Sequence, residues 1–153
     1  MQKTYLCIDL KSFYASVECV ELGLDPFKVN LVVADPTRGG GAITLAATPA
    51  IKKLGVSSRG RIFEIDPKIE YMMSPPRMHL YMEYSCKVYK VFLEFIAKED
   101  IHVYSIDEVM IDATPYLSTY GMTPYTLAMT MIRDVYQKTG ITATGGIGTN
   151  LYL

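Results

Sequence analysis

The chain has 153 residues, of which 50% are hydrophobic and 20% are charged, and its formal net charge at pH 7 is −1. This composition is that of an ordinary folded domain and excludes an intrinsically disordered chain. The balanced charge also excludes a strongly basic protein that grips nucleic acid by its phosphates alone, because phosphate neutralisation needs an excess of Lys and Arg. If nucleic acid is the substrate, metal ions bridge the charge or the gripping surface lies elsewhere.

The sequence predicts a cytoplasmic protein with no membrane partner. No charged-then-apolar leader opens it, and no run approaches the roughly 20 apolar residues that span a bilayer. Cys7, Cys19 and Cys86 are odd in number, far apart and in no CxxC pair. We therefore expect buried free thiols rather than a disulfide framework or a zinc ribbon.

The first third of the chain predicts a strand, a helix and a hairpin. The apolar residues 5–8 (YLCI) predict a buried strand over 4–9 that ends at Asp9. Ser12 is suited to cap a helix that ends near Gly23. The elements expected next are strands at 29–34 and 42–47, joined as a hairpin by a breaker-rich turn, and a short helix at 49–54.

The rest of the chain predicts the other elements of a sheet. Residues 66–77 contain three prolines and are typical of a connection. The elements expected after it are a strand at 78–82, a helix at 84–98, strands at 101–105 and 108–112, a helix at 124–138 and a strand at 141–148. With the first strand, this order favours the ferredoxin-like plan, an α+β fold with a mixed or antiparallel sheet and helices on one face. Residues 13–77 then form an insertion.

Three acids stand beside apolar strand residues: Asp9 follows Ile8, and Asp107 and Glu108 follow Ile106. A buried, unpaired carboxylate is costly and tends to protonate, so we expect a partner that stabilises these groups. Magnesium prefers oxygen ligands and completes its shell with water and substrate phosphates, so acids from adjacent strand ends suit it. On spacing alone an alternative stays open, in which Asp9 caps the next helix and the other two acids occupy a hairpin turn.

Four short blocks follow one another along the chain. They are D-x-x-x-F-Y-A-x-V-E at 9–18, K-x-L-G-V at 52–56, S-I-D-E at 105–108 and G-I-G-T-N at 146–150. In this order, over nearly the whole chain, they resemble the Y-family (translesion) DNA polymerases. The first is similar to that family's opening signature, the second to its fingers motif, the third to its acidic hairpin and the fourth to the turn after its last palm strand. Each block alone is a weak signal, and the set is specific.

The resemblance implies a metal-dependent catalytic site. Asp9 and Asp107 match the family's metal-bridging aspartates, and Glu108 matches the carboxylate that completes the site. The main-chain carbonyl of Leu10 matches a further metal ligand. The implied cofactor is Mg²⁺ or Mn²⁺, and the implied chemistry is two-metal nucleotidyl transfer.

The resemblance also implies nucleotide-binding residues. Tyr14 matches the steric-gate aromatic, whose ring lies under the sugar and would collide with a 2′-hydroxyl, and Phe13 precedes it in the same motif. Lys52 matches a basic residue that contacts the triphosphate. Many family members have a tyrosine just before that helix, where this chain has Thr48-Pro49. The Thr48-Pro49 version is closest to the UmuC (ImpB/MucB/SamB) branch of the family. In place of the tyrosine, Thr48 would make a weak contact with the phosphates.

The resemblance implies a palm sub-domain at 1–12 and 78–153 and a fingers sub-domain at 13–77. Y-family enzymes continue into thumb and little-finger domains, which we expect to be absent from a chain that ends at Leu153. Thr149 or Asn150 would cap a helix whose body is missing. We therefore expect the fragment to fold and to bind Mn²⁺ or Mg²⁺ weakly, without extending primers by itself.

The expected activity is that of the parent DNA polymerase, which would add deoxynucleotides to a primer 3′ end during damage bypass in the SOS response. Its partners would be primer-template DNA, deoxynucleoside triphosphates and a sliding clamp reached through the absent C-terminal region. Two other classes stay open. A palm-like nucleotide cyclase would share the sheet and the metals but have no steric gate at Tyr14, and a non-catalytic module of an SOS complex would bind no nucleotide.

Overall fold

The computed structural model describes residues 2–149, which form two compact units. The insert unit is Ser12–Tyr81, and the flanking unit consists of the described residues on either side of it. The chain thus passes from one unit to the other twice, the second time inside a helix. Among the described residues, every helix is too short or too polar to cross a bilayer.

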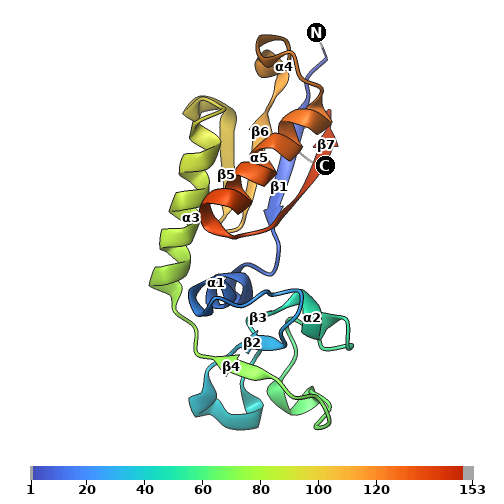
Figure 1. The fold of residues 1–153 in the computed structure, drawn as a ribbon, viewed down its shortest axis with the longest axis vertical. Coiled ribbons are helices and arrows are strands. Elements are labelled where there is room, and N and C mark those ends of the chain that lie inside the picture. Colours follow the sequence, from blue (N-terminus) through green and yellow to red (C-terminus); the bar gives the residue numbers. More distant parts are fainter. Residues whose placement is uncertain (1, 150–153) are drawn as a thin grey trace. The chain divides into compact units, whose positions relative to one another are not determined.

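The flanking unit is built on a four-stranded antiparallel sheet with the order β5-β6-β1-β7. Its strands are β1 (Tyr5–Leu10), β5 (Ile101–Ser105), β6 (Glu108–Asp112) and β7 (Ala143–Gly148). The helices are α3 (Met78–Leu93), whose first turn belongs to the insert unit, α4 (Thr114–Tyr120) and α5 (Pro124–Thr139). The chain order β1, α3, β5, β6, α5, β7 is the ferredoxin-like arrangement (Figure 1). The predicted α+β fold class is confirmed.

Alternation along β1 decides which of its residues face the core. Leu6, Ile8 and Leu10 are buried, whereas Cys7 is half-buried and Asp9 is exposed on the opposite face. Successive side chains of a strand point to opposite faces, so a strand with one apolar face is held in a single register. The same alternation leaves the last acid of the strand at the surface.

Helices α3 and α5 cover the same face of the sheet. Ile8 lines an apolar cavity of about 200 Å³ together with Val88 and Phe92 of α3. Ile8 is also paired in register with Gly145 of β7, where an added Cβ would lie 3.4 Å from Ile132 of α5. Figure 1 shows α5 crossing in front of β1 and β6. The opposite face, which carries Asp9, is therefore left without a helix in the described part of this unit.

A substitution at Gly145 tests this packing. We expect Gly145→Val to destabilise the protein by about 1 kcal/mol, because a Cβ there is already in van der Waals contact with Ile132 and Ala128 on α5 and the two methyl groups of valine would crowd them. Gly146→Val is the matched control, since a Cβ at that position meets nothing within 4 Å. Both changes place the same side chain in the same strand, so strand propensity cancels. Equal midpoints of urea unfolding for the two variants, followed by circular dichroism, would contradict the expectation.

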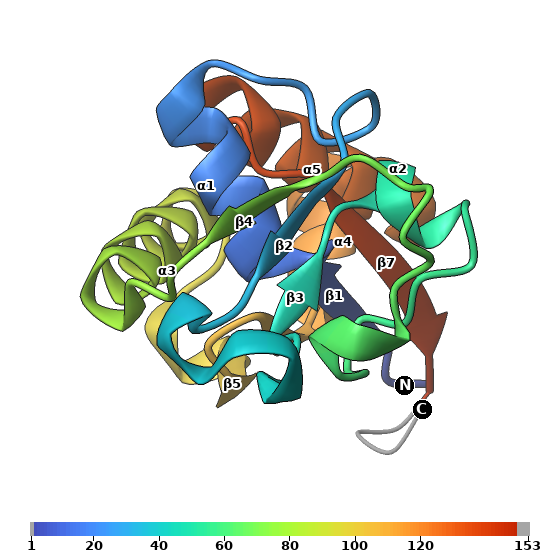
Figure 2. The same cartoon turned by 90° about the horizontal axis from the view of Figure 1, so that it is seen from below.

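The insert unit holds a smaller, three-stranded sheet (Figure 2). Its central strand β2 (Leu31–Val33) is antiparallel to β3 (Ala46–Ala47) and parallel to β4 (Met72–Ser74). The β2–β3 pair is the predicted hairpin, with a 3₁₀ segment, Pro36–Gly41, between the strands. The unit's other helical elements are α1 (Phe13–Leu22), α2 (Pro49–Lys52) and the 3₁₀ turn Ile62–Glu64. Its core cluster comprises Val32, Ala47, Ile51 and Ile65.

The strand predicted at 78–82 is wrong. These residues open α3, and strand β4 ends earlier, at Ser74, before two prolines. A short apolar run fits a strand or a buried helix equally well. The buried residues Tyr81, Tyr84 and Val88 show the three- and four-residue spacing that identifies the helix, and most of that spacing lies beyond residue 82.

Three smaller expectations also differ from the structure. Helix α4 was not expected, although Pro115 in its first turn and Gly121 at its end, with φ of 62°, are ordinary helix boundaries. Helix α3 ends at Leu93 rather than at 98. Ser12 stands at the N-cap position of α1, but its φ of 46° is left-handed and its side chain makes no cap hydrogen bond. The helix that Thr149 or Asn150 was expected to cap lies outside the described residues.

Candidate functional site

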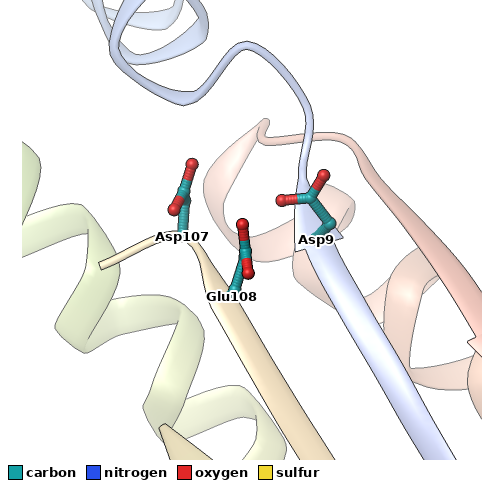
Figure 3. A group of neighbouring side chains, drawn as sticks. All are labelled: Asp9, Asp107 and Glu108. Atoms are coloured by element: carbon teal, nitrogen blue, oxygen red, sulfur yellow. The ribbon is translucent and has the colours of Figure 1, made fainter. Parts of the chain in front are cut away.

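Two antiparallel strands bring the three predicted acids together. Asp9 lies at the end of β1 directly opposite Glu108 at the start of β6, and Asp107 occupies the turn before β6. One carboxylate oxygen from each residue lies within 4.8 Å of the others. Asp9 and Glu108 are exposed and Asp107 is half-buried, so the cluster is open to solvent. Figure 3 shows the three carboxylates converging from the two strands.

Backbone and hydroxyl hydrogen bonds hold the acidic turn in place. The N–H of Leu10 donates to the carbonyl of Asp107 at 2.8 Å, which joins the end of β1 to the turn. The hydroxyl of Ser105 donates to Oδ1 of Asp107 at 2.9 Å, and that of Ser85 on α3 donates to the carbonyl of Ile106 at 2.6 Å. The Asp107 carboxylate is thereby oriented before any ligand arrives. The side chain of Leu10 is buried, so only its backbone is available to a ligand.

The acids also create a local negative field. Burial raises the pKa of the nearby Cys7 thiol, and the carboxylates of Glu108 and Asp9 raise it further. The thiol therefore stays protonated at neutral pH. Three clustered carboxylates with oxygen donors alone suit a hard divalent cation such as Mg²⁺ or Mn²⁺, which would neutralise their mutual repulsion.

In the insert unit, Tyr14 and Lys52 are accessible near the start of α1. Tyr14 is half-buried in the first turn of the helix, and its ring stacks on that of Tyr81 with a centroid distance of 4.5 Å. Lys52 is exposed at the end of α2, and its Nζ donates to the hydroxyl of Ser12 at 3.0 Å. The lysine ammonium group therefore lies beside the residue that precedes the Phe13-Tyr14 pair.

Two predicted nucleotide contacts do not fit their surroundings. The Thr48 side chain is fully buried, and its hydroxyl donates to the carbonyl of Val29 at 2.7 Å and accepts the N–H of Leu31 at 3.1 Å. It also accepts the N–H of Ile51 as the N-cap of α2. Since the hydroxyl is used to hold the hairpin and the helix, a phosphate contact by Thr48 is not supported. Phe13 is only 3% exposed and packs in the interior, away from solvent.

One group of residues was missed by sequence reasoning. Glu18 on α1 is buried and accepts hydrogen bonds from Arg77 and from the hydroxyl of Tyr81. The signal available in the sequence was the position of Glu18 among the apolar residues of α1. A carboxylate buried there needs a partner, so the position indicates that one exists. The partners themselves lie 59 and 63 residues away along the chain, a distance that no local pattern bridges.

Comparisons with known proteins agree with this picture. The sequence profile of the impB/mucB/samB family matches residues 8–153. A Bacillus subtilis (strain 168) protein named for UV-damage repair, UvrX, is 37% identical over 99% of this chain and 35% of its own length. DNA polymerase IV 2 of the same organism is 33% identical over 97% of this chain and 35% of its own length. The chain thus spans about a third of these curated relatives.

The fold is shared with solved polymerase structures. An insertion ternary complex of Dbh DNA polymerase superposes with a TM-score of 0.80 and 26% identity, over 96% of this chain and 43% of that one. A chimeric protein titled as a Y-family DNA polymerase matches with the same TM-score at 25% identity. The profile match, the relatives and the shared fold together establish that the chain belongs to the impB/mucB/samB family of Y-family DNA polymerases.

Proposed function

We propose that this chain is the palm and fingers part of a translesion DNA polymerase that performs two-metal nucleotidyl transfer during DNA repair. The flanking unit would be the palm and the insert unit, Ser12–Tyr81, the fingers. The observation that carries the proposal is the convergence of Asp9, Asp107 and Glu108, with oxygens within 4.8 Å of one another at adjacent strand ends. Membership of this family, whose relatives include DNA polymerase IV 2, supports the interpretation of the acidic cluster as a nucleotidyl-transfer site.

In this proposal Asp9 and Asp107 bind Mg²⁺ or Mn²⁺, Glu108 completes the carboxylate set, and the Leu10 backbone adds an oxygen. The bound ions would supply activation of the primer 3′-hydroxyl and neutralisation of the triphosphate charge. The chain's own contribution is preorganisation: the pairing of β1 with β6 fixes Asp9 against Glu108, and the Ser105 hydroxyl orients Asp107. Little rearrangement is then needed when the ligand binds.

The insert unit would handle the nucleotide. We assign to Tyr14 the choice of a deoxy sugar and to Lys52 a contact with the triphosphate, because an aromatic ring and a flexible ammonium group suit these two tasks. Thr48 and Phe13 are left out of the site because both are buried. Primer-template DNA, a sliding clamp and induction in the SOS response belong to the proposed role of the whole protein, of which residues 1–153 cover about a third of the length in relatives.

The test measures nucleotide binding rather than primer extension. Isothermal titration of the 153-residue chain with dATP and with ATP, both in Mn²⁺, is expected to show a preference of roughly tenfold for the deoxy form. Tyr14→Ala is expected to remove that preference while the dATP affinity stays close to that of the unmodified chain. Tyr71→Ala, in the same unit but packed against the core cluster, serves as the control and is expected to retain it.

Outcomes other than a preference for dATP would contradict the proposal in different ways. A preference for ATP would favour a nucleotide cyclase, and no binding of either nucleotide would favour a non-catalytic interaction module. Equal binding of both nucleotides by the unmodified chain would refute the assignment of Tyr14 as the sugar-selecting residue.

A further inference from the structure

The ring of Tyr14 rests on a second aromatic ring. Tyr14 and Tyr81 stack with a centroid distance of 4.5 Å and an angle of 13° between their planes. Tyr81 is fully buried, whereas Tyr14 is half-buried. One face of the Tyr14 ring is thus covered by a buried side chain, and stacked aromatic pairs of this kind add stability beyond the area that they bury.

Tyr81 is itself held by the carboxylate of an ion pair, in which Glu18 is buried and Arg77 is partly exposed. Its hydroxyl donates to Oε2 of Glu18 at 2.6 Å. Arg77 donates to the same carboxylate through Nε at 3.1 Å and through Nη2 to Oε1 at 2.5 Å, a two-point contact. The Glu18 side chain is only 4% exposed, so both of its oxygens are used inside the protein. A charged, bidentate contact holds one orientation more strictly than a single neutral bond.

Both ends of this set of contacts, Tyr14 and Glu18, lie on helix α1. Tyr14 and Glu18 are four residues apart on α1, and side chains at that spacing lie on the same helix face. The Tyr81 ring therefore spans two neighbouring positions of one helix, with its face against Tyr14 and its hydroxyl against Glu18. A swing of the Tyr81 side chain about its Cα–Cβ bond would move both the ring and the hydroxyl, and would break the stack and the hydrogen bond together.

The protonation states keep this arrangement in place. Burial raises the pKa of Tyr81, and the hydrogen bond to Glu18 raises it further, so the phenol remains a donor at neutral pH. The hydrogen bond to Glu18 also raises the pKa of Arg77, which stays charged. Arg77 and Tyr81 thus remain donors to the Glu18 carboxylate. A polar network whose groups are all hydrogen-bonded favours a single side-chain geometry.

We propose that Glu18, Arg77 and Tyr81 are positioning residues that hold the Tyr14 ring in place and thereby set how strictly the sugar of a bound nucleotide is selected. The proposal rests on the proposed function, in which Tyr14 selects the deoxy sugar. A ring free to turn about its side-chain bonds moves aside when a 2′-hydroxyl approaches. A ring clamped against Tyr81 does not yield, and the ribonucleotide is rejected.

The experiment compares the affinities of dATP and ATP in Mn²⁺ for three variants of the 153-residue chain. Tyr81→Leu keeps an apolar side chain and removes the stacked ring, and we expect the deoxy preference to fall about three- to tenfold through tighter ATP binding. Tyr81→Phe keeps the stack and loses the hydroxyl bond to Glu18, and we expect a smaller fall of about twofold. Tyr71→Leu makes the same chemical change at the core cluster and is expected to leave the preference unchanged.

The outcomes separate this proposal from the function on which it rests. No deoxy preference in the unmodified chain would refute both. A preference that is lost in Tyr14→Ala but fully retained in folded Tyr81→Leu would refute the positioning role alone. If circular dichroism shows that Tyr81→Leu does not fold, Tyr81→Phe decides, and an unchanged preference in that variant refutes the role. A purely structural role for Tyr81 predicts lower stability with the same ratio of affinities.

Discussion

Replacing Asp107 with Asn is expected to lower the affinity of the chain for Mn²⁺ by at least about 100-fold, since a hard cation is held mainly by charged oxygen ligands. Asp107 supplies one of three carboxylates whose oxygens lie within 4.8 Å of one another. The amide retains an oxygen that accepts the Ser105 hydroxyl, so the turn should keep its shape. Titration of Mn²⁺ into the purified chain, followed by the loss of the free-ion electron paramagnetic resonance signal, measures the change.

Asp112→Asn provides the control for charge. Asp112 lies on β6, at the other end of the strand from Glu108. Lys3 lies 3.8 Å from its carboxylate, which also accepts the N–H of Thr114. This variant loses the same charge outside the acidic cluster, and we expect Mn²⁺ binding to be unchanged. Equal losses in the two variants would mean that net charge, and not the cluster, attracts the ion. Unchanged binding in Asp107→Asn would remove the basis of the proposed function.

Arg77→Ala is expected to destabilise the insert unit by about 2 kcal/mol. The change leaves the Glu18 carboxylate buried, with the Tyr81 hydroxyl and without its positive partner. The cost falls below that of a fully buried pair because the Arg77 side chain is 49% exposed and its charge is partly screened by water. Hydrogen exchange of the α1 backbone amides reports on this unit specifically, and we expect their protection to fall with the loss of stability.

A surface ion pair in the same unit supplies the comparison. Arg38 lies 3.8 Å from Asp35, with both side chains exposed, and Arg38→Ala is expected to leave amide protection almost unchanged. Adding Glu18→Gln to Arg77→Ala should recover part of the lost stability, because a neutral amide still accepts the Tyr81 hydroxyl and costs less to bury. If Arg77→Ala has no larger effect than Arg38→Ala, Glu18 does not depend on its partner.

The parts of the fold that were predicted correctly are those with a local signal. Strands β5 and β6 begin and end where the sequence placed them, because apolar alternation and the turn between them are read from neighbouring residues. The order of the elements favoured a ferredoxin-like sheet, mixed or antiparallel, and the structure shows that it is antiparallel. Asp9 and Glu108 are close for the same reason, since pairing of the strands that carry them places these two residues opposite each other.

Contacts made at a distance could not be read from the sequence. A buried Thr48 looks the same in the sequence as an exposed one, and only the fold shows that its hydroxyl is used by Val29 and Leu31. Of the partners of Glu18, Arg77 lies at the end of the predicted connection 66–77, and Tyr81 lies in the predicted strand 78–82, which is helical in the structure. Spacing within α1 shows which residues share a helix face, but not which side chain from elsewhere covers that face. The roles of Tyr14 and Lys52 stay predictions until nucleotide binding is measured.

The central place of β1 in its sheet has a consequence for biosynthesis. Its residue Tyr5 pairs with Asp112 on one side and with Gly148 on the other. On the ribosome, β1 emerges with its apolar face of Leu6 and Ile8 well before either neighbour has been translated. At about 5–20 residues per second, the second neighbour follows on the order of ten seconds later. During that interval the insert unit has the sequence it needs to fold, while β1 has both edges open until β6 is translated and one edge open until β7 follows. We expect a nascent chain stalled before β6 to be the form most prone to aggregate or to recruit chaperones.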